Sequence, residues 1–228
     1  MHHKLQIEQE TQRFFTKVFG WMFLGLLLSG FTAYYVSITP AILAIIFSSQ
    51  IVFFGLLIVE LVLVISLSAF IKKVSATLAT FLFLLYSFVT GLTLSVIFLV
   101  YTIESINLVF FITGGMFGLM SFIGYTTKMD LTKFGPILFM GLLGIIIAGF
   151  ANLFLRNSML DFIVTIIGVI IFTALTAYDI QRIKKTNIIG NEGTEEDHKE
   201  AIIGALTLYL DFINLFLKLL RLTGKRKN

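Results

Sequence analysis

Seven long apolar stretches recur along this chain of 228 residues, and they constrain its fold more than any other feature. A helix that crosses the hydrocarbon core of a bilayer needs about 20 predominantly apolar residues. No stretch alternates apolar and polar residues over about ten positions, as a strand of a membrane barrel would. The sequence therefore predicts an all-α integral membrane protein. Its seven transmembrane helices are expected at Val18–Val36, Gln50–Ile71, Ala76–Val100, Leu108–Thr127, Phe134–Phe154, Leu160–Asp179 and Ala201–Leu222.

The composition agrees with a chain that lies almost entirely in the bilayer. Hydrophobic residues make up 57% of it and charged residues only 13%, against about 45–50% and about 25% in soluble domains. No polar stretch is long enough for a second domain. We expect a cytoplasmic N-terminal arm at residues 1–17, a transmembrane domain at 18–222 and a basic tail at 223–228. The absence of cysteine excludes disulfides and thiolate metal ligands.

The basic residues flank the apolar segments, which indicates topology signals rather than a nucleic-acid partner. Cytoplasmic loops of membrane proteins carry an excess of Lys and Arg. With the N-terminus in the cytoplasm, the arm and the inside loops hold eleven basic residues, whereas the outside loops before the last segment hold only Arg156. We therefore predict a multi-pass protein of the cell membrane with a cytoplasmic N-terminus.

The C-terminal end breaks this pattern. Five basic residues would lie outside if all seven segments span: Lys218, Arg221, Lys225, Arg226 and Lys227. Either the last segment re-enters and returns its tail to the cytoplasm, or it spans while other helices shield it from lipid. We favour the shielded span, because polar residues interrupt the apolar run.

Asp211 lies in the middle of that last segment. A carboxylate at this depth costs about 2.5–3.5 kcal/mol and normally faces a protein interior or a water-filled cavity. The small and polar residues of the segment recur three and four apart, so they share one helical face. They are Gly204, Thr207, Asp211, Asn214, Lys218 and Arg221. The pattern predicts a helix packed among others, with this stripe turned to a partner helix or to an ion path.

Asp179 and Glu60 are the other acidic residues within apolar segments. The sixth segment also carries a small and polar stripe that ends at Asp179, so pairing of the two stripes would bring Asp179 and Asp211 together. Two carboxyl groups in a low-dielectric site would share a proton or hold a hard cation such as Ca²⁺, with carbonyls and water completing the shell.

Each of these acidic residues also has a structural alternative. Asp179 could form an interfacial ion pair with one of three nearby basic residues, Arg182, Lys184 and Lys185. Glu60 is either hydrogen-bonded to hydroxyl groups of adjacent helices or a deeper station on the same ion path. The spacing of Gly114, Gly118 and Ser121 predicts close helix packing, since small residues let backbones approach. The polar loop Thr186–Glu200 is expected to be solvated.

Three motifs in order, GYTTKMDL followed by GP, AYDIQ and LYLDFINLFL, resemble the bacterial branch of the Bax inhibitor-1 family of membrane proteins. The resemblance runs from about Gly20 to Arg221. It implies a C-terminal helix that is central and surrounded by the other six, and a location in the bacterial inner membrane. It also implies a pH-sensitive calcium leak, in which Asp179 and Asp211 act as pH sensor, gate and calcium ligands.

Further roles follow from the same resemblance. Glu60 matches the family's acidic residue in the second helix. Independently of the resemblance, Thr207 and Asn214, on the polar stripe of the last segment, are candidates for lining the ion pathway. A basic residue near the end of the second helix would latch onto the aspartate pair, and Lys72 and Lys73 are the candidates. Neither is an arginine, which disfavours a bidentate latch.

Two functions are therefore open. The first is a pH-sensitive calcium leak channel or transporter, with the bilayer, protons and Ca²⁺ as partners and no covalently bound cofactor. The alternative is a regulatory protein that binds another membrane protein, such as a membrane-anchored protease, through the N-terminal arm or the sixth loop. An intramembrane aspartyl protease is disfavoured, because Asp211 lies in LYLD and the G-x-G-D signature is missing. We expect no enzymatic activity.

Overall fold

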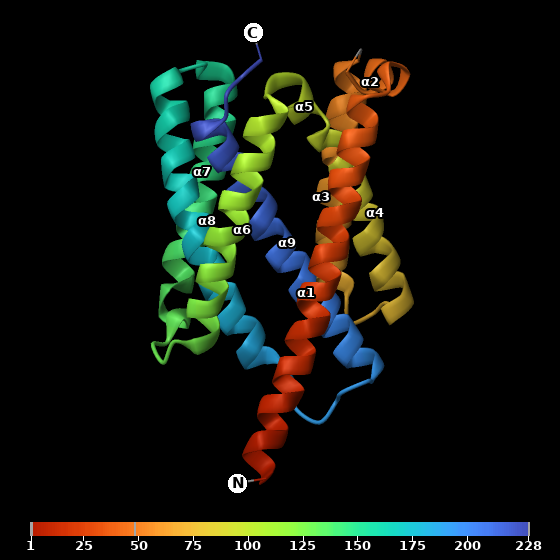
Figure 1. The fold of residues 1–228 in the computed structure, drawn as a ribbon, viewed down its shortest axis with the longest axis vertical. Coiled ribbons are helices and arrows are strands. Elements are labelled where there is room, and N and C mark those ends of the chain that lie inside the picture. Colours follow the sequence, from red (N-terminus) through yellow and green to blue (C-terminus); the bar gives the residue numbers. More distant parts are fainter. Residues whose placement is uncertain (1, 48, 228) are drawn as a thin grey trace. The chain divides into compact units, whose positions relative to one another are not determined.

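The computed structural model describes residues 2–47 and 49–227, so Met1 and Asn228, at the ends of the predicted arm and tail, lie outside the described residues. Within the described ranges, seven helical segments are long and apolar enough to cross a membrane, which confirms the predicted fold class. The elements are α1 (His2–Ser37), α2 (Pro40–Phe47), α3 (Gln50–Phe70), α4 (Ala76–Leu94), α5 (Val96–Val100), α6 (Ile103–Thr126), the 3₁₀ helix η1 (Leu131–Phe134), α7 (Gly135–Leu155), α8 (Ser158–Thr186) and α9 (Glu195–Thr223) (Figure 1).

Four helices extend well beyond the apolar segments that predicted them. The arm continues α1, α6 starts at Ile103, α8 runs on to Thr186, and α9 starts at Glu195. Acidic residues stabilise the first turn of a helix and basic residues the last, because these charges oppose the helix dipole. The first turn of α9 carries three acidic residues, and the last turn of α8 carries two lysines. The backbone N–H of Asp197 also donates to Thr194 Oγ1 at 3.2 Å, which caps α9.

The chain forms two compact units, and α9 contributes to both. Unit 1 comprises Met1–Val100 and Asn187–Tyr209, and unit 2 comprises Tyr101–Thr186 and Leu210–Asn228. The helix is unbroken from Glu195 to Thr223, a length of about 43 Å at 1.5 Å per residue. A continuous helix of this length favours the spanning alternative over re-entry.

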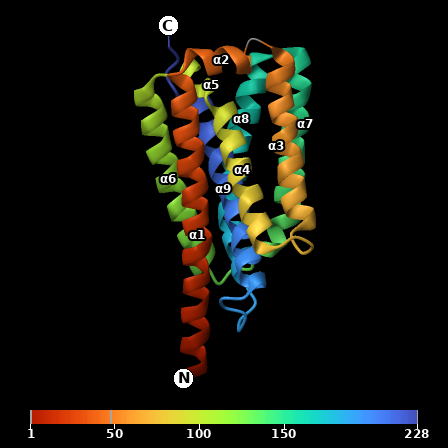
Figure 2. The same ribbon diagram turned by 90° about the vertical axis from the view of Figure 1, so that its right-hand side faces the viewer.

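In unit 1, α1 packs along α4, α3 packs against α4, and α2 lies across the ends of α1 and α3 (Figure 2). Gly91 permits the close approach of α1 and α4, because a Cβ there would lie 2.6 Å from the Cβ of Thr32. The first half of α9 inserts Tyr209, which is fully buried and meets Phe83 and Tyr86 edge-on. Its hydroxyl oxygen lies 2.6 Å from Oγ of Ser29.

In unit 2, α8 packs against both α6 and α7 (Figure 1). Gly124 on α6 lies against the backbone carbonyl of Ala177 on α8, and a Cβ there would clash with it. The prediction of close packing at Gly114 and Gly118 is wrong, because a Cβ at either position would meet no atom of the described chain within 4 Å. The backbone contact of α6 lies nearer its C-terminal end, at Gly124, three residues after the buried Ser121.

Candidate functional site

Asp179 of α8 and Asp211 of α9 lie together in unit 2, as their stripes predict. Both are buried, with 6% and 5% of their surface exposed. The two carboxyl groups lie close enough to interact with each other. Because carboxylates only accept hydrogen bonds, such a pair holds together when one member carries a proton. The geometry therefore suits a pair that shares one proton, while its role as sensor and gate stays a prediction.

One oxygen of the pair is not satisfied. Oδ2 of Asp211 is buried and has no hydrogen-bond partner that meets ordinary geometry among the described residues. Leaving a buried acceptor without a partner costs about 1–3 kcal/mol. A water molecule or a cation bound to this oxygen would remove that cost. In the described part of the chain, no three His, Cys, Asp or Glu side chains cluster as metal ligands. Ca²⁺ at the pair would thus need carbonyl and water oxygens as well.

Of the three basic residues that could form an ion pair with Asp179, only Arg182 remains a candidate. It lies one turn further along α8 and attracts the carboxylate electrostatically. The other two candidates are engaged elsewhere. Lys184 donates to the carbonyl of Tyr125 at 2.9 Å, and Lys185 donates to Asp130 at 2.5 Å. The hydrogen bonds from Lys185 and Thr132 lower the pKa of Asp130, which lies in the α6–α7 connection, from 3.8 to about 2.

The predicted pathway residues have partners of their own. Glu60 on α3 accepts a hydrogen bond from Thr93 Oγ1 on α4 at 2.6 Å, so the structural alternative for this residue is realised. The Thr207 hydroxyl donates to the carbonyl of Ile203 at 3.0 Å, and the Asn214 amide donates to the carbonyl of Leu210 at 2.8 Å. Both are bonds within α9, and both side chains remain half-buried rather than enclosed.

The candidate latch residues follow the C-terminal end of α3. Lys72 lies on the wall of a cavity of about 380 Å³, together with three isoleucines, Ile71, Ile188 and Ile203. The ammonium of Lys73 lies 5.7 Å from the ring centroid of Phe70. A latch from either lysine to the aspartate pair stays a prediction.

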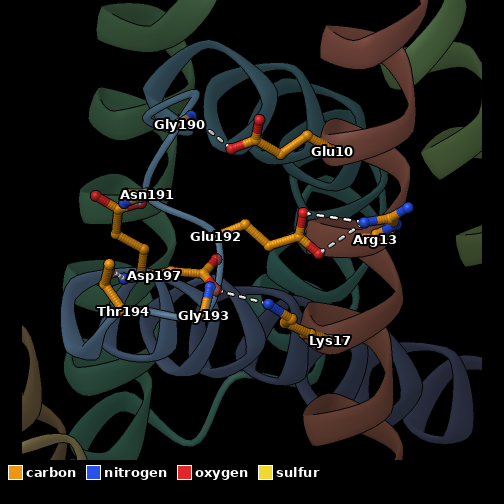
Figure 3. A network of polar contacts seen from close by, with 10 residues as sticks. Glu10, Arg13, Lys17, Gly190, Asn191, Glu192, Gly193, Thr194 and Asp197 are labelled. Carbon is orange, nitrogen blue, oxygen red and sulfur yellow. Dashed lines mark hydrogen bonds and ion pairs between the residues drawn. The ribbon is translucent and has the colours of Figure 1, made fainter.

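A polar contact that the sequence did not predict joins α1 to the loop before α9 (Figure 3). Glu10 accepts from the backbone N–H of Gly190 at 2.6 Å, Arg13 pairs with Glu192 at 3.2 Å, and Lys17 pairs with Asp197 at 2.6 Å. We call this set of pairs the arm–loop contact. The expectation of a solvated loop is wrong at Asp197, which is 3% exposed. The spacing of Glu10, Arg13 and Lys17 on one helical face was the available signal.

Gln181, in the AYDIQ motif, is a second residue whose role emerged only from the structure. Its amide donates to the carbonyl of Met129 and accepts from the N–H of Leu131, both at 2.8 Å. The side chain is buried and uses both ends of its amide. It therefore fastens the α6–α7 connection to α8, two residues beyond Asp179.

These features define a multi-pass helical membrane protein with a buried carboxyl pair between its last two helices. The chain belongs to the Bax inhibitor-1 family, because the family model described as "Inhibitor of apoptosis-promoting Bax1" matches residues 11–228. Among its relatives, the inner membrane protein YbhL of Escherichia coli strain K12 is 51% identical, with 95% of this chain and 93% of the relative covered. An uncharacterized protein of Borreliella burgdorferi is 50% identical over the same shares of both chains. An uncharacterized protein of Rickettsia prowazekii is 41% identical, with 97% of this chain and 93% of the relative covered.

Proposed function

We propose that this protein is a calcium leak pathway of the bacterial inner membrane, gated by the proton that Asp179 and Asp211 share. The observation that supports the proposal is the buried carboxyl pair between α8 and α9. A cytoplasmic N-terminus belongs to the same proposal, and the asymmetry of basic residues between the loops supports it.

The gate would work through charge. With the shared proton in place, the pair is a hydrogen-bonded clasp with one negative charge, and it holds α8 and α9 together. Loss of the proton leaves two carboxylates side by side in a low-dielectric site, where their repulsion favours separation of the helices. The same two charges, with the unpartnered Oδ2 of Asp211, then offer hard oxygen ligands to a divalent cation.

The other candidate residues take supporting roles in this proposal. Glu60, Thr207 and Asn214 would exchange their present hydrogen bonds for contacts with a passing ion. Lys72 or Lys73 would neutralise the deprotonated pair and so limit the leak. Each role requires that the side chain leave the partner described above, which makes it separately testable by substitution.

The test is calcium flux into liposomes that contain the purified protein and a calcium indicator, measured across a pH series. We expect flux to rise with pH in the natural protein. In Asp211→Asn, the amide still hydrogen-bonds Asp179 but no shared proton remains, so the pH dependence should disappear. Asp130→Asn is the matched control, because it removes a carboxylate outside the spanning segments.

Two results would count against the proposal in different ways. An unchanged pH profile in Asp211→Asn would remove the sensor assignment and leave the leak itself in place. Absence of calcium flux from the natural protein at every pH would remove the leak.

A second candidate function is regulation of another membrane protein, such as a membrane-anchored protease. The observation that favours it is the cavity of about 380 Å³ beside Lys72, whose wall combines apolar side chains with Glu196, Lys199 and Glu200. Interfaces commonly combine an apolar centre with a charged rim. Ile188→Ser, in the exposed part of the wall, should weaken co-purification with such a protease. Equal recovery with the natural protein would argue against this function.

A further inference from the structure

A second cavity, of about 390 Å³, lies in unit 2 where α7 turns into α8, and basic side chains gather on its wall. The polar residues that line it are Asn152, Arg156, Asn157, Ser158, Asp161, Lys218 and Arg221. Three cationic side chains thus face one carboxylate, which leaves an excess of two positive charges. Arg156, Lys218 and Arg221 are also among the basic residues that do not fit the predicted excess of positive charge in the cytoplasm.

The single carboxylate is already used. Arg221 Nε donates to Oδ2 of Asp161 at 2.8 Å, and a second guanidinium nitrogen contacts the other oxygen of that carboxylate. This two-point pairing is the strong form of an Arg–carboxylate contact. It fixes Arg221 at the wall and leaves no acidic partner in the cavity for Lys218 and Arg156.

The aliphatic stem of Lys218 packs against Gly168 of α8. A Cβ at Gly168 would lie 2.9 Å from Cε and 3.0 Å from Cδ of Lys218, so the aliphatic stem lies directly against the glycine. The side chain is half-buried, and its ammonium forms no hydrogen bond or ion pair within the described ranges. It interacts electrostatically with Arg221 and Asp161, which already bind each other.

Arg156 occupies an unusual backbone position. Its φ is 49°, in the left-handed region, where glycine or asparagine is usual. Only Arg156 and Asn157 separate α7 from α8, so the chain must turn sharply here. The guanidinium, like the Lys218 ammonium, has no acidic partner in the part of the chain that the structure describes.

Two amide side chains complete the wall as hydrogen-bond donors. Oδ1 of Asn152 accepts from the backbone N–H of Asn157 at 2.9 Å, and Oδ1 of Asn157 accepts from the N–H groups of Met159 and Leu160 at 2.9 and 3.1 Å. With both carbonyl oxygens bound to backbone, each side chain has its NH₂ group left to donate. The cavity therefore presents mainly donors and positive charge, and the Ser158 hydroxyl on its wall can donate as well.

We propose that this cavity binds a phosphate group, presented either by the headgroup of an anionic phospholipid or by soluble phosphate. Arginine binds phosphate oxygens through two parallel N–H groups, and lysine binds them as a point charge. Leu153 lines the wall, and Leu155 lies two residues further along the chain. The two side chains are 65% and 66% exposed. These apolar side chains give the acyl chains of a bound lipid a surface beside the headgroup.

The test uses the full chain in neutral detergent, titrated with short-chain phosphatidylglycerol, matched phosphatidylcholine or inorganic phosphate. Native mass spectrometry gives the number bound, and thermal unfolding checks that each variant is folded. We expect one phosphatidylglycerol per chain, bound at least about ten-fold more tightly than phosphatidylcholine, as one charged hydrogen bond provides.

Arg156→Gly is the central variant, because glycine suits the left-handed backbone and removes only the side chain. We expect it, and Lys218→Gln, each to weaken phosphatidylglycerol binding about ten-fold or more. Arg156→Lys and Lys218→Arg should retain most of the affinity. Lys133→Gln, in η1 outside this cavity, makes the same change of charge and should leave binding unchanged.

The two phosphate sources separate in the same titrations. If inorganic phosphate binds as tightly as the lipid and is weakened by Arg156→Gly, soluble phosphate is the ligand. If only the lipid binds, the headgroup is the ligand. Equal affinity for the two lipids without phosphate binding, or affinities that Arg156→Gly and Lys218→Gln leave unchanged while both remain folded, would overturn the proposal.

Discussion

In a soluble protein the more apolar helix is the more deeply buried one, whereas α7 and α9 show the reverse relation between apolar character and burial. The more apolar of the two is α7, yet only 6% of its most apolar stretch is buried, against 61% for α9. Of the large apolar residues of α9, Leu222 alone is exposed within the described part of the helix. Lipid solvates apolar side chains, so burial inside a bilayer follows polar groups, small residues and hydrogen bonds. The central position predicted for α9 agrees with its burial and stays a prediction.

The largest expected difference between the two helices is at aromatic residues. Tyr209→Ala should destabilise the protein by about 3–5 kcal/mol, because it empties a fully buried site between Phe83 and Tyr86. Phe154→Ala on α7, where the side chain is 76% exposed, should change stability by less than about 0.5 kcal/mol. Unfolding titrations in mixed micelles measure both, and similar losses would contradict the contrast between the helices.

A charged pair extends the comparison to the first turn of α9, outside the apolar core. Lys17→Met should cost about 1.5–3 kcal/mol, because the buried Asp197 carboxylate would retain only the N–H of Gly193, 2.9 Å away. Arg13→Met breaks an exposed pair, 63% and 36% accessible at its two ends, and should cost no more than about 1 kcal/mol. The same unfolding titrations apply, and a reversed order would show that burial does not set the strength of these pairs.

Glycines on α6 sharpen the distinction between protein-facing and lipid-facing surface. Gly124→Ala should cost about 1–3 kcal/mol, because α6 and α8 must separate to admit the methyl group. Gly118→Ala has open space and should be neutral or stabilise by up to about 1 kcal/mol. Thermal unfolding of the two variants side by side tests this, and an equal loss would mean that Gly118 also faces a helix.

The smallest effect concerns Asp130, just before α7. Its pKa falls from 3.8 to about 2 on folding, so its pairing with Lys185 stabilises the protein above pH 4 and is lost as the pH falls toward 2. Asp130→Asn should therefore melt slightly below the natural protein at pH 7 and together with it at pH 2. A constant difference between the two melting curves across this range would contradict the assignment.

The sequence predicted what depends on local pattern. Seven apolar runs sufficed for the seven spanning helices. The stripes around Asp179 and Asp211 indicated that the two could pair, but left an ion pair of Asp179 with a nearby basic residue equally open. Spacing failed at Gly114 and Gly118, because small residues occur on lipid-facing surfaces as well as at helix contacts. The arm–loop contact escaped prediction since its partners lie about 180 residues apart, a separation over which periodicity carries no information.

That separation has a consequence for how the protein is made. The basic groups at positions 13 and 17 belong to the first helix to leave the ribosome, whereas their acidic partners are added 179 and 180 residues later. At about 5–20 residues per second, the first helix waits roughly 10–35 s before these partners exist. The arm–loop contact therefore forms late in biosynthesis. Chains that stop before position 190 should lack it, and their first helix should be more accessible to quality-control proteases.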